Sequence, residues 1–214
     1  MEKYHNDEEI IPNLKITLIG DSGSGKTCII NRYLNDEFSP YKVSTIGVSC
    51  SNKLIKRNNK LLRLDLWDTA GQEQYRALGK HFYKDSYVII LVYDITNRES
   101  FENLKIVWYK DLLNYNEKYT ILAVVGNKSD LYEIEKVSEE EGRNYAKEIN
   151  AIFMLVSAKN GDNINNLFND IVNLYLEPTF QEKVDEMNNK DNGSVRLKKH
   201  FRKEEEKFKS KACC

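Results

Sequence analysis

The chain has 214 residues and a mass of 25.0 kDa, which is enough for one domain of ordinary size and a tail. Hydrophobic residues make up 41% and charged residues 30%, a composition that allows a packed core and excludes a wholly disordered or fibrous chain. The 32 Lys and Arg against 33 Asp and Glu give a net charge of -1, which disfavours a basic nucleic-acid-binding protein.

The cysteines and the apolar runs indicate a reducing compartment. Cys28 and Cys50 are far apart, whereas Cys213 and Cys214 are adjacent at the C-terminus, and this spacing fits neither a disulfide framework nor a zinc site. The longest apolar run, residues 87–93, is far shorter than the roughly 20 residues that span a bilayer. We therefore expect a cytosolic chain that reaches membranes by another route.

Short apolar runs alternate with longer helical stretches between residues 14 and 176. The expected strands are residues 14–19, 49–57, 60–67, 87–93, 120–125 and 151–156. The expected helices are residues 26–34, 99–115, 138–148 and 163–176. Asn58-Asn59 indicates a hairpin between the second and third strands, and Ser138 with Glu141 predicts a capping box. This order predicts an α/β fold, with a six-stranded, mostly parallel sheet and helices on both faces.

The periodic pattern ends at Pro178, so we divide the chain into a short extension (residues 1–12), one domain (13–177) and a flexible tail (178–214). The tail holds ten Lys and Arg against seven Asp and Glu, a net +3. Its last 22 residues alone carry eight basic and three acidic residues, a net +5 directly before the two terminal cysteines. A basic segment of this kind favours an anionic membrane surface.

Residues 20–27, GDSGSGKT, match the phosphate-loop pattern G-x-x-x-x-G-K-[ST] and lie between the first strand and the first helix. Glycines let backbone N–H groups surround phosphate oxygens, and the helix N-terminus adds its positive dipole end. Lys26 would then reach the β- and γ-phosphates, and the Thr27 hydroxyl would bind Mg²⁺. The predicted nucleotide-binding residues here are Asp21, Ser22, Gly23, Ser24, Gly25, Lys26, Thr27 and Cys28. This loop alone does not distinguish ATP from GTP.

Two further motifs follow the fifth and sixth expected strands, at the sheet edge where ligands bind in open α/β sheets. In Asn127-Lys128-Ser129-Asp130, the aspartate can accept hydrogen bonds from the N1 and N2 donors of guanine, a pairing that adenine does not offer. Ser157-Ala158-Lys159 supplies a second wall for the base, and Phe38 is the candidate aromatic edge against it.

The segment Asp68-Thr69-Ala70-Gly71-Gln72 ends the third strand. Asp68 is placed to hold Mg²⁺ through water, the Gly71 N–H to meet a γ-phosphate, and Gln72 to orient a water for in-line attack. Thr45, before the second strand, is the candidate second protein ligand of the metal. The predicted metal residues are therefore Thr27, Thr45 and Asp68, and the predicted catalytic residue is Gln72.

Together these motifs resemble the small GTPases of the Ras superfamily over residues 14–176. Residues 46–48, 64–73 and 92–96 resemble its Rab branch, and the terminal Cys213-Cys214 is similar to the paired cysteines on which Rabs are geranylgeranylated. The stretch 77–86 resembles endosomal Rabs. The resemblance implies a P-loop GTPase fold and a GTP/GDP switch that regulates vesicle traffic, on the cytoplasmic face of intracellular (endosomal) membranes and in the cytosol.

The resemblance also implies a mechanism and a set of partners. Bound GTP would hold residues 38–47 and 68–84, and slow hydrolysis would release them. The implied partners of this monomer are an exchange factor, a GTPase-activating protein, a GDP-dissociation inhibitor, a Rab escort protein with geranylgeranyl transferase, and GTP-state effectors. A membrane is bound through prenyl chains, and no nucleic acid is expected.

The effector surface departs from the family pattern. It would comprise Ile46, Gly47, Cys50, Trp67 and Phe82, where Cys50 replaces the usual Phe, so an aromatic anchor is lost. Two other functional classes remain: a kinase or ATPase on the same phosphate loop, disfavoured by the two base motifs, and a GTP-binding scaffold without hydrolysis, disfavoured by Gln72.

Overall fold

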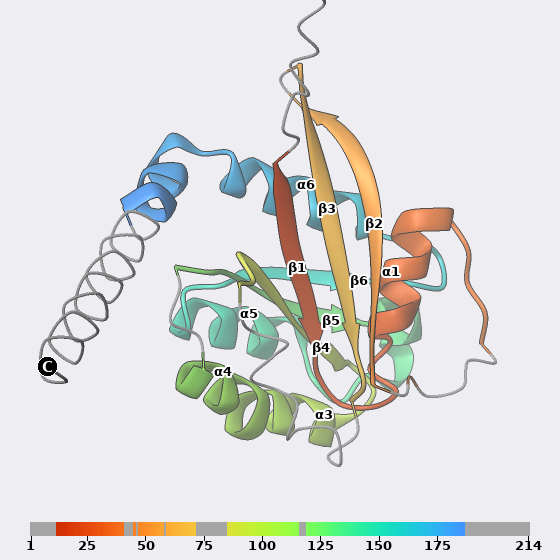
Figure 1. Ribbon diagram of the computed structural model, residues 1–214. Coiled ribbons are helices and arrows are strands. Elements are labelled where there is room, and N and C mark those ends of the chain that lie inside the picture. The colour runs from red at the N-terminus through yellow and green to blue at the C-terminus, as the bar shows by residue number, and fades with distance from the viewer. Residues whose placement is uncertain are drawn as a thin grey trace, which may run out of the picture. The chain divides into compact units, whose positions relative to one another are not determined.

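The computed structural model describes residues 12–40, 45, 47–57, 59–71, 85–115 and 119–186 (Figure 1). Its strands form one sheet in the order β2-β3-β1-β4-β5-β6. They are β1 Asn13–Ile19, β2 Val48–Arg57, β3 Lys60–Thr69, β4 Val88–Asp94, β5 Ile121–Asn127 and β6 Ile152–Val156. Only the β2–β3 pair, the predicted hairpin, is antiparallel among the pairs of this sheet. The predicted six-stranded, mostly parallel sheet is confirmed, with strand ends displaced by one or two residues.

The helical segments from α1 to α6 follow the predicted order, with two differences. They are α1 Lys26–Asn35, α3 Arg98–Asn103, η2 Leu104–Tyr109, α4 Lys110–Tyr115, η3 Ser129–Ile134, α5 Glu139–Glu148 and α6 Ile164–Tyr175. The stretch expected as one helix over residues 99–115 is interrupted by η2, a π-helix, and the 3₁₀-helix η3 was not predicted. Apolar spacing of three or four residues does not detect one extra residue in a turn, which is why the π-helix was missed.

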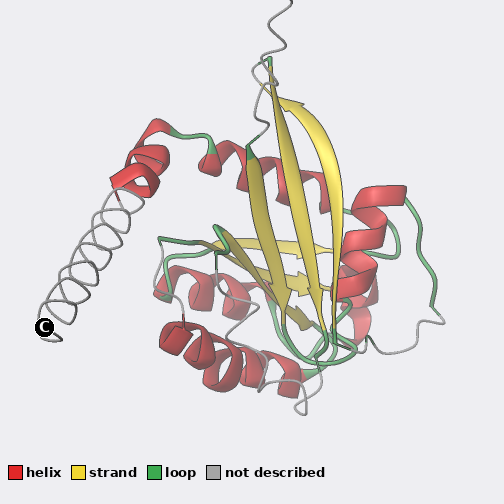
Figure 2. Ribbon diagram, in the orientation of Figure 1, coloured by secondary structure: helices red, strands yellow, loops and turns green. Residues whose placement is uncertain are grey.

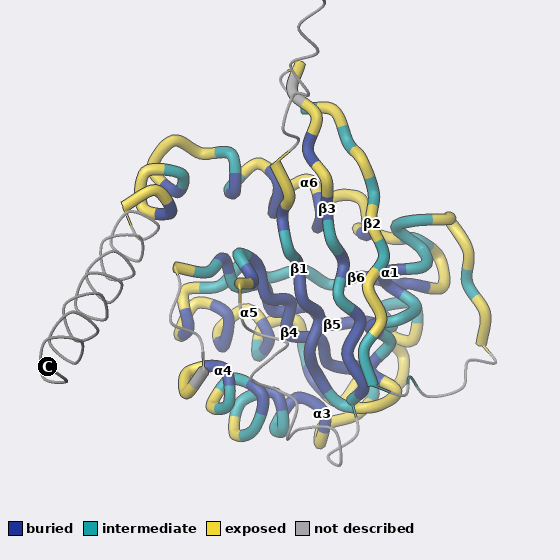
Figure 3. Tube along the Cα trace, viewed as in Figure 1, coloured by how far each residue is buried: buried dark blue, intermediate teal, exposed yellow. Residues whose placement is uncertain are grey.

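Helices lie on both faces of the sheet, with α3, η2, α4 and α5 on one face and α1 on the other (Figures 1 and 2). Successive strand residues point to opposite faces, and Ile89, Leu91 and Tyr93 of β4 join the buried cluster formed with α3, η2 and α5. On the other face, the Tyr33 ring of α1 stacks on Phe168 of α6 with centroids 3.8 Å apart. Figure 3 shows that the central strands β4 and β5 are almost wholly buried, as the parallel sheet requires.

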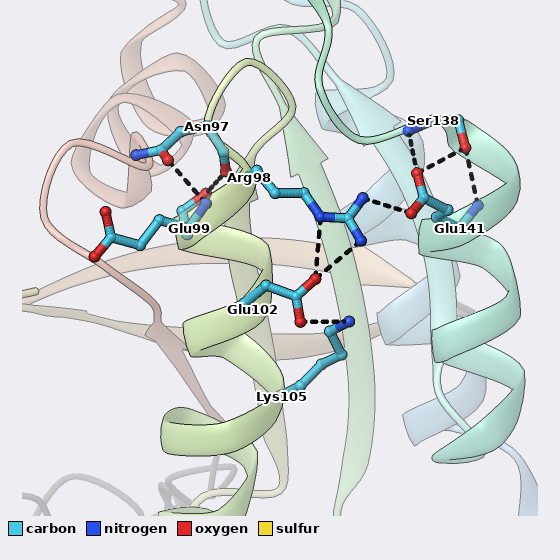
Figure 4. Close-up of polar contacts among 8 residues, drawn as sticks. Asn97, Arg98, Glu99, Glu102, Lys105, Ser138 and Glu141 are labelled. Carbon is cyan, nitrogen blue, oxygen red and sulfur yellow. Dashed lines mark hydrogen bonds and ion pairs between the residues drawn. The ribbon is translucent and has the colours of Figure 1, made fainter.

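The start of α5 has the predicted capping box, which is joined to α3 by a chain of ion pairs (Figure 4). The backbone N–H of Glu141 donates to the Ser138 hydroxyl at 3.3 Å, and the Ser138 N–H donates to the Glu141 carboxylate at 3.1 Å. Arg98 pairs with both Glu141 and Glu102, and the bond to Arg98 lowers the pKa of Glu141. Lys105 pairs with Glu102 at 2.9 Å. Because these charges are exposed, they orient the two helices more than they stabilise the fold.

The chain divides into two compact units, residues 1–171 and 172–214. In the described part of the second unit, helical structure continues over residues 178–186, where we expected the tail to begin. Proline is tolerated in the first turn of a helix, so Pro178 begins this helix rather than ending regular structure. The ring centroids of Tyr175 and Phe180 are 5.8 Å apart, and the Gln181 side chain donates to the Tyr175 carbonyl. Among the helices described, none is both long and apolar enough to cross a membrane.

Candidate nucleotide-binding site

Five parallel strands, β1, β3, β4, β5 and β6, end at the same edge of the sheet. The loops that follow β1, β3, β5 and β6 surround a cavity of about 490 Å³ there. Its lining comprises Ser22, Gly23, Gly25, Lys26, Thr27, Cys28, Phe38, Ser39, Pro40, Thr45, Thr69, Gly71, Asn127, Lys128, Asp130, Leu131, Ala158 and Lys159. The motifs predicted from separate parts of the sequence therefore meet in one cavity.

The phosphate loop presents Lys26 at the start of α1. The Lys26 ammonium donates to the carbonyls of Gly20 at 2.7 Å and Asp21 at 2.9 Å. Burial lowers the pKa of Lys26 to about 8, and the charges of Asp68 and Asp21 oppose this shift. A phosphate group in the cavity would supply the negative charge that favours the protonated lysine.

Oxygen atoms from three separate segments converge beside Lys26. The Thr27 hydroxyl donates to the Asp68 carboxylate at 2.6 Å and lies 2.9 Å from the Thr45 hydroxyl, which itself donates to Asp68 at 3.3 Å. Hydroxyl and carboxylate oxygens are the ligands that Mg²⁺ takes, usually together with phosphate oxygens and water. The donor set therefore fits the predicted metal. The part of the chain that the structure describes holds no cluster of three or more His, Cys, Asp or Glu suited to another metal.

The end of β3 packs closely on the phosphate loop. The Ser22 N–H donates to the Gly71 carbonyl at 3.1 Å, and the Ala70 N–H donates to the Gly47 carbonyl at 2.8 Å. A Cβ on Gly71 would lie 2.2 Å from the Ser22 nitrogen, so only glycine fits at this position. The backbone of residue 71 can therefore approach whatever the phosphate loop binds.

The buried Asn127 side chain joins the phosphate loop to the loop after β6. Its amide donates to the Ser24 carbonyl at 2.8 Å, and its oxygen accepts from the Ala158 N–H at 3.2 Å. Gly25 has a φ of 94°, and a Cβ there would lie 2.1 Å from the Asn127 amide nitrogen. Glycine at position 25 is thus required both by the turn and by this contact.

Asp130 is held against the second base motif. The Ser157 hydroxyl donates to one carboxylate oxygen of Asp130 at 2.6 Å, and the Lys159 ammonium lies 3.5 Å from the other. Lys128 has a φ of 69°, and its ammonium lies 2.6 Å from the carboxylate of Asp94, the last residue of β4. The carboxylate of Asp130 consequently lines the cavity in a fixed orientation.

Arg32 of α1 supports the same wall and was not predicted from the sequence. Its guanidinium donates to the carbonyls of Ala158 at 2.9 Å and Lys159 at 2.6 Å. It also pairs with Asp36 just beyond the helix end, at 2.9 Å. The sequence contains no signal for these hydrogen bonds, because Arg32 is 126 and 127 residues away from the two carbonyls that it contacts.

The remaining predicted residues divide into three groups. Asp21, Ser24, Asp68 and Ser157 do not line the cavity. The Asp21 carboxylate bonds to the α3–η2 segment, the Ser24 side chain is buried, Asp68 accepts from Thr27, and Ser157 donates to Asp130. Cys50 and Trp67 of the predicted effector surface are directly opposite each other in the β2–β3 register. The residues outside the described ranges are Ile46, Gln72, Phe82, Cys213 and Cys214.

Comparisons with known proteins agree with this geometry. The model of the Ras family matches residues 15–177. Ras-related protein Rab-22A of Homo sapiens is 44% identical over 158 residues, which cover 74% of this chain and 81% of that protein. Ras-related protein SEC4 of Saccharomyces cerevisiae is 39% identical over 86% of this chain and 85% of its own length. Ras-related protein Rab-11B of Dictyostelium discoideum is 41% identical over 84% and 81%, respectively.

The cavity joins a phosphate loop to two base-facing motifs, on a six-stranded sheet of the order given above. This combination defines a P-loop GTPase. The chain belongs to the Ras family, within its Rab branch of small GTPases. It is accordingly an enzyme that hydrolyses GTP to GDP and phosphate, in a branch that serves vesicle trafficking.

The position of Arg32 yields a prediction for nucleotide retention. Arg32→Ala removes the donors to the Ala158 and Lys159 carbonyls, so bound GDP should dissociate about tenfold faster. Arg32→Lys should fall between the two, since an ammonium lacks the planar fork of donors. The measurement is release of fluorescent GDP into excess unlabelled GDP. Arg143→Ala, at an exposed ion pair on α5, should release GDP like the unmodified protein, and equal rates for all four proteins would contradict the role of Arg32.

Proposed function

We propose that this GTPase is a guanine-nucleotide switch that regulates vesicle traffic, cycling between a GDP-bound state and a GTP-bound, membrane-associated state. The observation that carries the proposal is the meeting of the phosphate loop with Asn127, Asp130 and Ala158 in one cavity. The phosphates would lie against the backbone of residues 21–27 and Lys26, and the guanine against Asp130 and Phe38.

Thr27 and Thr45 would bind Mg²⁺ directly, with Asp68 holding it through water. Their convergence within 3.3 Å supports this assignment. The metal would neutralise charge on the β- and γ-phosphates. Thr45 lies in the segment before β2, and Gly71 lies two residues beyond the end of β3, so both segments would respond to the presence of a γ-phosphate.

For hydrolysis, we assign Gln72 to orient the attacking water and the Gly71 N–H to meet the γ-phosphate. The intrinsic rate would be slow, and a GTPase-activating protein would accelerate it by about 10³- to 10⁵-fold by supplying groups in trans. An exchange factor would restore the GTP state, and effectors would bind the surface that includes Gly47, Cys50 and Trp67.

Membrane attachment would follow from prenylation of Cys213 and Cys214 by geranylgeranyl transferase with its escort protein. Two lipid chains give stable anchoring where one does not, and the basic residues before them favour an anionic leaflet. We assign residues 13–177 to the GTPase domain, flanked by the N-terminal extension 1–12 and the tail 178–214, and a GDP-dissociation inhibitor would extract the monomer. Similarity to Rab-22A and the 77–86 stretch favours endosomal membranes.

Guanine selectivity is the direct test of the cavity. The unmodified protein should bind fluorescent GDP at least about a hundredfold more tightly than ADP, because adenine does not offer the paired N1 and N2 donors that guanine presents to the Asp130 carboxylate. Asp130→Asn should weaken GDP binding by a similar factor, since an amide offers one acceptor instead of two. Asp162→Asn changes an exposed carboxylate outside the cavity lining and serves as the matched control. Equal affinity for GDP and ADP would refute the proposal.

The role of Gln72 is tested separately from binding. Gln72→Leu keeps the size of the side chain but removes the group that orients water, so single-turnover GTP hydrolysis should slow by about ten- to a hundredfold with GTP affinity unchanged. Gln74→Leu, the same change two residues further along, should hydrolyse GTP at the original rate. Hydrolysis by Gln72→Leu at that same rate would remove Gln72 from the catalytic step.

The lipid anchor predicts where the protein is found in cells. Exchanging Cys213 and Cys214 together for Ser should move the tagged protein from the membrane pellet to the supernatant on fractionation, with GDP binding intact. Ala212→Ser, which leaves both cysteines in place, should remain with the membranes. Persistent membrane association of the double variant would contradict the anchor.

A further inference from the structure

The Asp21 carboxylate is in the phosphate loop but is directed away from the cavity that the loop lines. One of its oxygens accepts from the Asn103 amide at 2.7 Å, and the other accepts from the indole N–H of Trp108 at 2.7 Å. Both donors belong to the helical segment on one face of the sheet, some 80 residues along the chain. We call this set of three side chains the Asp21 bridge.

The π-helix explains how both donors reach one carboxylate. Asn103 and Trp108 are five residues apart, and in an α-helix such residues point about 140° away from each other. A π-helix closes its turn between residues i and i+5, so it brings this pair onto one side. The π segment Leu104–Tyr109 begins directly after Asn103 and contains Trp108. π turns are frequently found at functional sites, and here the turn delivers Trp108 to the phosphate loop.

The backbone of Asp21 positions the groups that face the nucleotide. Its carbonyl accepts from the Lys26 ammonium at 2.9 Å and from the Ser24 N–H at 3.2 Å. The next residue, Ser22, donates its N–H to the Gly71 carbonyl. A displacement of Asp21 would therefore move the anchor of Lys26 and the contact with Gly71 together.

We propose that Asn103 and Trp108 are positioning residues for nucleotide binding and act through Asp21, by holding the phosphate loop in the conformation that presents Lys26 to the phosphates. This inference rests on the guanine-nucleotide binding proposed above. Neither residue lines the cavity, so neither would touch the nucleotide. The Asp21 bridge also gives the nucleotide site a mechanical link to the helix that carries Trp108, which is 4% exposed within the core.

The test compares release of fluorescent GDP from four proteins: the unmodified chain, Asp21→Asn, Trp108→Phe and the double variant. Asp21→Asn offers one acceptor in place of two, and Trp108→Phe removes the N–H but keeps an aromatic ring in the core. Each should release GDP about tenfold faster, and the double variant should fall short of the product of the two single effects, because both changes weaken the same bridge at the Asp21 carboxylate. Tyr109→Phe, which removes a hydroxyl from the neighbouring π-helical residue, should release GDP like the unmodified protein.

A second readout separates positioning from general stability. With Trp67→Phe, Trp108 is the only tryptophan of the chain, so tryptophan fluorescence reports on the surroundings of Trp108, which include the Asp21 carboxylate. Its emission should change when GDP is removed with EDTA, and Asp21→Asn should abolish most of that change. A merely structural role would lower the melting temperature of the variants without altering this signal.

The outcomes separate a failure of the Asp21 bridge from a failure of guanine-nucleotide binding. If the unmodified protein retains GDP selectively but Asp21→Asn and Trp108→Phe release it at the original rate, the inference fails and the proposed function stands. It also fails if the two changes act additively, if Tyr109→Phe has the same effect, or if Trp108 emission is insensitive to GDP. If the unmodified protein does not prefer GDP to ADP, the proposed function and this inference both fall.

Discussion

The buried Asn127 carboxamide is the interaction on which the site depends. It contains a donor and an acceptor on one short side chain, and it uses the donor on the phosphate loop and the acceptor on the loop after β6. Aspartate offers no donor to the Ser24 carbonyl and glutamine is longer by a methylene, so neither replaces it in this geometry. These two bonds fix the distance between the phosphate-facing half and the base-facing half of the cavity. Glycine at position 25 follows from the same contact, since any Cβ would collide with this amide.

The base-facing half is supported from several directions. Arg32 holds two carbonyls of the loop after β6, Ser157 fixes the Asp130 carboxylate, and Asp94 pairs with Lys128. These supports come from α1, β4 and the β6–α6 loop, all in the first compact unit. The metal-facing half relies on hydroxyls and a carboxylate that contact one another within 3.3 Å. Such contacts are easily exchanged for bonds to a cation, as the proposed Mg²⁺ site would require.

Local sequence patterns predicted the strands and helix starts of this protein. Features that depend on contacts between distant residues were not predicted. The buried strands read as continuous apolar runs and the start of α5 as a capping box, so both could be predicted without a structure. Thr27, Thr45 and Asp68 were predicted as the metal residues, and the structure brings their oxygen atoms within 3.3 Å of one another, while their role toward a metal stays a prediction. The role of Arg32 could not be predicted, because it donates to backbone carbonyls of Ala158 and Lys159, which are 126 and 127 residues away in the sequence. The π turn was missed because inserting one residue leaves the apolar spacing almost unchanged.

The β2–β3 pair carries two residues of the proposed effector surface, Cys50 and Trp67. Cys50 is opposite Trp67 in the register, and the Lys15 ammonium lies 4.2 Å from the centre of a Trp67 ring. Partial burial and the nearby Asp65 raise the pKa of the Cys50 thiol, so at neutral pH it is a small neutral group and not a nucleophile. An aromatic side chain at this position would bury 150–250 Å², about the contribution of one interface anchor. An effector of the kind proposed above would therefore gain its contact area here from Trp67 and its surroundings, and it would be selected by different chemistry from one that relies on an aromatic at position 50.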